Sequence, residues 1–167
     1  MTENQPPPQG NTYLMDPESA AEMARLMMQD RAFTEAMHGL FPERSSLESI
    51  QAILDVACGP GGWTLDVAHT YPDRKVVGID ISTRMIAYAQ AQASAQRLSN
   101  ATFLLMNALE PFKFTEETFD LVNIRAATGF VPRAQWPTLL QNCFRVLRPG
   151  GTLRLTEAET GARHFFA

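Results

Sequence analysis

Short apolar runs alternate with amphipathic stretches along most of the chain. Runs of four to eight residues rich in Val, Ile, Leu and Phe are typical of strands, and apolar residues three or four positions apart are typical of helices. Strands are expected near 52–57, 75–80, 102–105, 120–124 and 152–156, and helices near 63–70, 83–96 and 136–147. Strands that alternate with helices predict an α/β fold, with a parallel sheet covered by helices on both faces.

The segment before this alternation has a different pattern. Residues 1–12 include three consecutive prolines, and we expect them to form a disordered tail. Residues 13–48 are expected to form a helical lid or cap, which begins with Asp16 as N-cap and Pro17 at the first helical position. Residues 49–167 would then form the core of the domain.

Apolar side chains in this helical segment recur at helical spacing. They are Met23, Leu26, Met27, Met37 and Leu40. Two interpretations are open: the stripe packs on the sheet, or it forms an adaptable wall over an apolar substrate.

Composition restricts the possible functions. A chain of 167 residues is long enough for one domain with its own core. The formal net charge of −4 argues against a nucleic-acid partner, because phosphate binding needs a basic face. The sequence shows no long uncharged apolar run, no signal peptide and no Cys/His spacing typical of a metal site, so we expect a cytoplasmic protein without membrane or metal contacts that acts on a small molecule.

The most informative stretch runs from Ile53 to Thr64. An apolar run that ends in Asp55 is followed by a turn with Gly59 and Gly61 and then by a helical pattern. Glycine allows a sharp turn and a close approach of backbone to ligand, and the amides of the next helix can bind an anion. A second apolar run ends in Asp80, about twenty residues after the glycines, where an acid can accept hydrogen bonds from both hydroxyls of a ribose.

The order of motifs distinguishes between nucleotide cofactors. A dinucleotide site needs a third glycine where this chain has Thr64, which weakens a nicotinamide interpretation. The run 55–62 instead resembles the first motif of class I S-adenosylmethionine-dependent methyltransferases. The family's later motifs resemble the runs 78–86, 107–108, 119–122 and 145–151, in the same order, and the match covers roughly 51–157.

This resemblance implies a three-layer Rossmann-like sheet of strand order 3-2-1-4-5 and S-adenosyl-L-methionine as the cofactor. It implies that Asp80 holds the ribose, that the Gly59–Gly61 backbone contacts the methionine part, and that Asp55 lies near the ammonium group. Ile81 and Met85 would enclose the adenine ring, and Asn107-Ala108 replaces the family's usual acid and small residue beside the adenine amino group. The full set of expected cofactor-binding residues is Asp55, Ala57, Gly59, Gly61, Asp80, Ile81, Met85, Asn107, Ala108, Asn123 and Arg125.

Other roles for these residues stay open. Asp55 could simply bind turn amides, Met85 could pack in its helix, Asn107 could be a loop residue, and Arg125 could be a solvated surface residue. A side chain at Gly61 is expected to impair ligand binding more than folding. No histidine is placed as a general base, and the catalytic residues stay unknown.

The family's sheet normally has seven strands, and the last two have no counterpart here. We therefore interpret the chain as a fragment whose fifth strand forms an exposed edge, which could self-associate or be covered by a terminal segment. The run 123–127 lacks the Asn/Asp-Pro-Pro-aromatic signature of methyltransferases that act on planar nitrogens, which favours a small-molecule acceptor. The hypotheses are a small-molecule methyltransferase, a cofactor-binding module without catalysis and, less favoured, a nicotinamide-dependent oxidoreductase.

Overall fold

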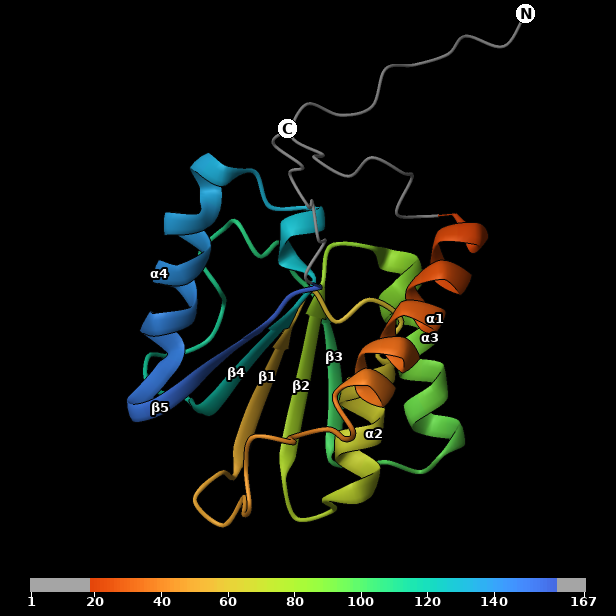
Figure 1. The fold of residues 1–167 in the computed structure, drawn as a ribbon, viewed down its shortest axis with the longest axis horizontal. Coiled ribbons are helices and arrows are strands. Elements are labelled where there is room, and N and C mark those ends of the chain that lie inside the picture. The colour runs from red at the N-terminus through yellow and green to blue at the C-terminus, as the bar shows by residue number, and fades with distance from the viewer. Residues whose placement is uncertain (1–18, 159–167) are drawn as a thin grey trace, which may run out of the picture.

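Residues 19–158 are described by a computed structural model, in which five parallel strands form one sheet (Figure 1). The strand order is β3-β2-β1-β4-β5, as predicted. The strands are β1 (Ala52–Val56), β2 (Lys75–Asp80), β3 (Ala101–Leu105), β4 (Phe119–Arg125) and β5 (Leu147–Thr156). The order reverses between β1 and β4, so the carboxyl ends of these two strands flank the crevice in which such sheets bind ligands.

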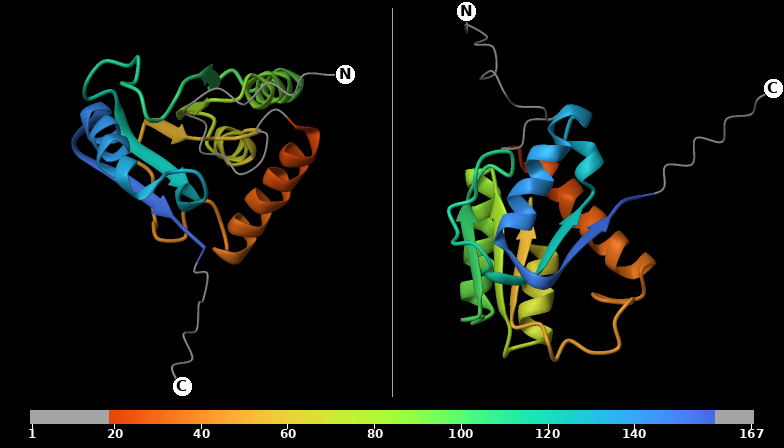
Figure 2. Two further views of the ribbon diagram at one scale, coloured as in Figure 1. Left: turned by 90° about the horizontal axis from the view of Figure 1, so that it is seen from above. Right: turned by 90° about the vertical axis from the view of Figure 1, so that its left-hand side faces the viewer.

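Three helices cover the two faces of the sheet (Figure 2). Helices α2 (Gly62–Thr70) and α3 (Thr83–Ala95) lie on one face, where their apolar side chains pack with Ile53, Val76 and Phe103. Helix α4 (Trp136–Val146) lies on the other face and packs with Leu54, Val122 and the rest of the largest core cluster. The expected three layers are therefore present.

The connections after β3 and β4 contain little regular structure. The loop between β3 and β4 contributes Phe112 and Phe114, which cover part of the face that α4 leaves open. After β4 come two short 3-10 helices, η1 (Ala127–Gly129) and η2 (Arg133–Gln135), which the sequence pattern did not predict.

Strand β5 begins earlier than expected because it contains a bulge. Phe119 pairs with Leu147 and Leu121 with Thr152, so four residues of β5 lie opposite a single residue of β4. The bulge includes Gly150, whose φ of +78° is in the left-handed region that favours glycine. The motif at 148–151 is thus a distortion of the strand rather than a turn before it.

Helix α1 (Ala20–Ala36) lies beside α2, next to the loop that follows β1 (Figures 1 and 2). Its N-cap is Ser19, whose hydroxyl accepts a hydrogen bond from the Glu22 amide, so the helix begins later than the sequence predicted. The predicted cap Asp16 and Pro17 lie outside the described residues. No core cluster of residues 19–158 includes an α1 side chain, and Met28 is 66% exposed. Of the apolar stripe, Leu40 packs against the core cluster that contains Ile53, whereas Met27 on α1 is 36% exposed, so both interpretations of the stripe stay open.

Three residues of the loop between β1 and α2 have a left-handed backbone conformation. Ala57, Gly59 and Gly61 have φ values of 56°, 55° and 82°. A Cβ atom at Gly61 would lie 2.7 Å from the Phe103 ring and 2.9 Å from the Ala89 side chain, both of which are buried. The lack of a side chain at Gly61 is thus needed for packing of the loop on β3 and α3, and the expected contact of Gly61 with the cofactor stays a prediction.

Replacing Gly61 with Ala should lower the free energy of unfolding more than the same change at Gly150. Both positions have a positive φ, which costs an Ala residue about 1–2 kcal/mol, but a Cβ at Gly150 has no neighbour within 4 Å. The clash at Gly61 should add about 1–3 kcal/mol. Urea unfolding of the two variants would measure the difference, and equal losses would contradict the packing role of Gly61.

Candidate functional site

A row of buried polar side chains crosses three strands on the face covered by α2. Asp55 pairs in register with Asn123, and Asn123 with Arg154. The Asn123 Nδ2 donates to Asp55 Oδ1 at 2.8 Å, and the Arg154 Nη1 donates to Asn123 Oδ1 at 2.9 Å. Each member of the row is at least 92% buried, so the hydrogen bonds replace the water that these groups lose on folding.

Asp55 also receives a hydrogen bond from the first turn of α2. The Thr64 hydroxyl donates to Asp55 Oδ2 at 2.7 Å, so both carboxylate oxygens are bonded to side chains and not to turn amides. Burial raises the pKa of Asp55 to about 6, although the hydrogen bonds from Thr64 and Asn123 and the charge of Arg154 act in the opposite direction. Thr64, which replaces the third glycine of a dinucleotide site, thus orients this carboxylate.

Asn123 lies inside β4 and not at its end, and its two polar atoms are used by Asp55 and Arg154. Its role in the structure is to connect these two charged groups. The predicted contact between Asn123 and the cofactor stays a prediction.

Arg154 is the residue of this network that sequence reasoning missed. Its Nε lies 2.9 Å from Glu43 Oε1, and its guanidinium lies 5.6 Å from the ring centre of Phe41 and 5.8 Å from that of Trp63. An arginine between leucines in a predicted strand is an unusual signal, since a charge that is buried needs a partner. The sequence offered a candidate partner in Asn123, a polar residue of the neighbouring strand β4.

Asp80 holds the glycine loop from the neighbouring strand end. Its Oδ2 accepts a hydrogen bond from the Gly59 amide at 2.8 Å, and its Oδ1 accepts one from the Ser82 amide at 2.9 Å. Because the carboxylate is only 8% exposed, these two bonds fix its position at the edge of the loop. Asp55 at the end of β1 and Asp80 at the end of β2 thus both lie next to the loop.

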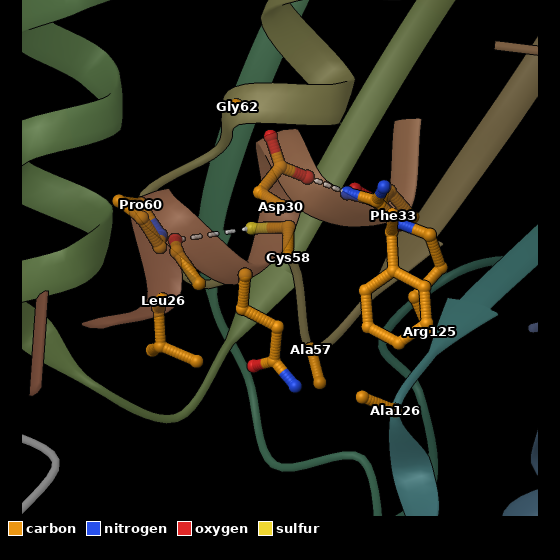
Figure 3. Close-up of a pocket in the computed structure, with 12 residues that line it drawn as sticks. Leu26, Asp30, Phe33, Ala57, Cys58, Pro60, Gly62, Arg125 and Ala126 are labelled. Atoms are coloured by element: carbon orange, nitrogen blue, oxygen red, sulfur yellow. Dashed lines mark hydrogen bonds and ion pairs between the residues drawn. The ribbon is translucent and has the colours of Figure 1, made fainter. Parts of the chain in front are cut away.

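Two adjoining cavities lie between the glycine loop and α1. The inner cavity has a volume of about 50 Å³, and the outer cavity has a volume of about 450 Å³. They share Leu26, Gln29, Ala57, Gly59, Arg125 and Ala126. Asp30, Asp55 and Cys58 line only the inner cavity (Figure 3), while Thr128, Phe130 and Glu157 line only the outer one.

Arg125 lies between the glycine loop and α1. Its side chain is 13% exposed, forms an ion pair with Asp30 (Figure 3) and donates a hydrogen bond to the Thr34 hydroxyl. The guanidinium also lies 5.6 Å from the centre of the Trp63 ring. Burial and the positive charge of Arg154 lower the pKa of Arg125 to about 9. The alternative of a solvated surface arginine is therefore excluded.

The residues expected around the adenine ring differ in accessibility. Ile81 is 48% exposed directly after β2, whereas Met85 is buried in the first turn of α3, as its alternative role of helix packing requires. Asn107 accepts a hydrogen bond from the Leu109 amide and donates one to Glu110, and the carbonyl of Ala108 accepts one from Asn142. Ile81 and Asn107 are thus accessible to a ligand, and Met85 is not.

Among residues 19–158 no group of three or more His, Cys, Asp or Glu side chains is arranged to bind a metal ion. No helix in this part of the chain is both long and apolar enough to cross a bilayer. Cys143 is buried, whereas Cys58 is partly exposed at the inner cavity. Both cysteines are free.

The buried acid predicts a pH-dependent stability. The pKa of Asp55 is raised from 3.8 to about 6 in the folded chain, so between these pH values the native state binds a proton that the unfolded state releases. The free energy of unfolding should therefore fall as the pH rises through this range, by on the order of 3 kcal/mol from this group.

Asp55→Asn removes this titration and keeps a side chain of the same shape. Urea unfolding of both proteins at pH 4, 5, 6 and 7 would give two curves whose difference isolates Asp55. We expect the native protein to lose stability relative to the variant as the pH rises. Parallel curves would show that Asp55 titrates normally.

Comparison with known proteins identifies the family. A family model described as a methyltransferase domain matches residues 53–151, more than half of the chain. A demethylmenaquinone methyltransferase of Lactococcus lactis is 38% identical over 101 residues, which cover 60% of this chain and 39% of the relative. Another of that name, from Symbiobacterium thermophilum, is 35% identical over 125 residues, 74% of this chain and 49% of the relative.

A solved structure titled as a putative S-adenosyl-L-methionine-dependent methyltransferase of Methanococcus maripaludis has the same fold. It superposes with a TM-score of 0.71 over 95% of this chain and 68% of that one, at 16% identity. The chain spans less than half the length of the two curated relatives. The family match, the sheet order and the glycine loop agree, and the chain belongs to the methyltransferase-domain family.

Proposed function

We propose that the chain binds S-adenosyl-L-methionine and that the protein to which it belongs transfers the methyl group to a small molecule. The observation that carries this proposal is the pair of buried carboxylates, Asp55 and Asp80, next to the glycine loop. When bound, the cofactor supplies a methyl group on a sulfonium. The protein's residues then need to bind, align and exclude water.

The side chains around the loop fit such a cofactor. The two oxygens of Asp80 each accept a backbone hydrogen bond, and the carboxylate lies at the end of β2, where an acid can accept hydrogen bonds from the hydroxyls of a ribose. Asp55 lines the inner cavity and suits the ammonium group, since its carboxylate lacks a directly bonded cation among the described side chains. Asn107 is placed after β3, where its side chain could bind the adenine amino group.

The outer cavity supports a small acceptor with an apolar body. Its volume of about 450 Å³ falls within the range of small-molecule sites, about 300–1,000 Å³. Leu26, Ala126 and Phe130 give it apolar walls, and it adjoins the inner cavity along the glycine loop. Two of the relatives are named demethylmenaquinone methyltransferase.

We further propose that the protein is cytoplasmic and acts without nucleic-acid or membrane partners, which its formal net charge of −4 supports.

We also propose that two copies of the chain associate through β5. In the described part of the sheet β5 pairs with β4 alone, and Leu155 is 45% exposed. Light scattering should then detect dimers, and a monomer at all concentrations would contradict this proposal.

Replacing Asp80 with Asn should weaken S-adenosylmethionine binding about ten- to hundredfold, because a charged hydrogen bond contributes about 1.5–3 kcal/mol. Asn keeps one oxygen acceptor but loses the charge. Titration calorimetry would measure the affinity. Asp73→Asn is the matched control, since it removes an equal charge from an exposed turn just before β2.

NAD should not bind to either protein. Equal affinities of the native chain and Asp80→Asn for S-adenosylmethionine would refute the role of this acid. If the native chain bound NAD instead, the proposed cofactor would be wrong.

A further inference from the structure

The inner cavity contains charges of both signs. Asp55 and Arg125 both line it, and they come from the neighbouring strands β1 and β4. Asp55 pairs in register with Asn123, and Arg125 lies two residues further along β4, so the two charged side chains project from the same face of the sheet. A carboxylate and a guanidinium on one face are complementary to the ammonium and carboxylate groups of an α-amino acid.

In the structure the guanidinium is already bound by α1. Asp30 forms an ion pair with Arg125, and Thr34, one helical turn further along, accepts a second hydrogen bond. The Asp30 carboxylate also lies against the start of α2, where any side chain on Gly62 would collide with it. It therefore occupies a place next to both a buried cation and the positive end of a helix dipole.

The same helix lines one side of the cavity. Leu26, Asp30 and Phe33 of α1 line its outer side, and Leu26 is 3.6 Å from the position of a Cβ at Gly59. The remaining volume of about 50 Å³ is small for the amino-acid end of a cofactor. A ligand that placed its carboxylate on Arg125 would have to displace Asp30.

We propose that Arg125 binds the carboxylate of the amino-acid end of S-adenosylmethionine, and that Asp30 occupies this position in the unliganded chain. This inference rests on the proposed function. It makes α1 a lid that competes with the cofactor through one carboxylate. Asp55 would bind the ammonium group at the other end of the same cavity.

The test compares two ligands that differ in this end. S-adenosylhomocysteine carries the amino-acid group, and 5′-methylthioadenosine does not. Asp30→Asn should bind S-adenosylhomocysteine about tenfold more tightly than the native chain, because the internal competitor loses its charge. Arg125→Gln should bind it at least tenfold more weakly. Neither substitution should change the affinity for 5′-methylthioadenosine.

Glu35→Gln is the matched control, because it removes the same charge from an exposed position on the same helix. It should leave both affinities unchanged. Thermal unfolding would show that each variant is folded. If Arg125→Gln is unfolded, Arg125→Lys replaces it in the experiment. Lys keeps the positive charge but cannot form bidentate hydrogen bonds with a carboxylate. This variant should therefore bind S-adenosylhomocysteine more weakly and 5′-methylthioadenosine as the native chain does.

The outcomes separate the two proposals. If the native chain bound neither ligand, the proposed function would fail. If it bound both, but Asp30→Asn weakened S-adenosylhomocysteine binding or left it unchanged, Asp30 would be a structural partner of Arg125 and the inference would be overturned. Equal effects of Arg125→Gln on both ligands would also overturn it.

Discussion

The buried carboxylate of Asp55 is the group on which the arrangement of this site depends. A charge taken out of water is costly unless hydrogen bonds replace its hydration. Asp55 obtains these bonds from Thr64 on α2 and Asn123 on β4, and Asn123 is held in turn by Arg154 on β5. The row therefore forms only when three strands lie in register and α2 starts at the correct place. The same requirements shape the glycine loop that connects β1 to α2.

Ion pairs connect α1 and the segment that follows it to the site, and Phe41, Leu47 and Ile50 of that segment also pack in the core with Trp63. Arg125 and Arg154 both lie within 6 Å of the centre of the Trp63 ring, and each pairs with an acid from this region, Asp30 or Glu43. Such contacts depend on charge and can be exchanged for contacts with a ligand. A helix held in this way is better suited to open and close than one packed into the core.

Apolar periodicity and glycine turns predicted the strands and most of the element boundaries, because both are local signals, and the family resemblance supplied the expected sheet order. The sequence also predicted that Asp55 and Asp80 lie at strand ends, as they do. It could not predict the contacts of Asn123 with Arg154 or of Arg125 with Asp30, which join residues 31 and 95 positions apart. Strand register and helix placement determine these pairs, and a local sequence pattern predicts neither of them. For Met85, helical spacing alone could not separate a buried side chain from one that faces a ligand.

A crystal structure of the chain with S-adenosylhomocysteine would test the central claim most directly. We expect the ribose hydroxyls within hydrogen-bond distance of Asp80 and the amino-acid end beside the glycine loop, above the row formed by Asp55, Asn123 and Arg154. Ligand density elsewhere on the molecule, or a reversed ligand with its adenine over Asp55, would contradict the account.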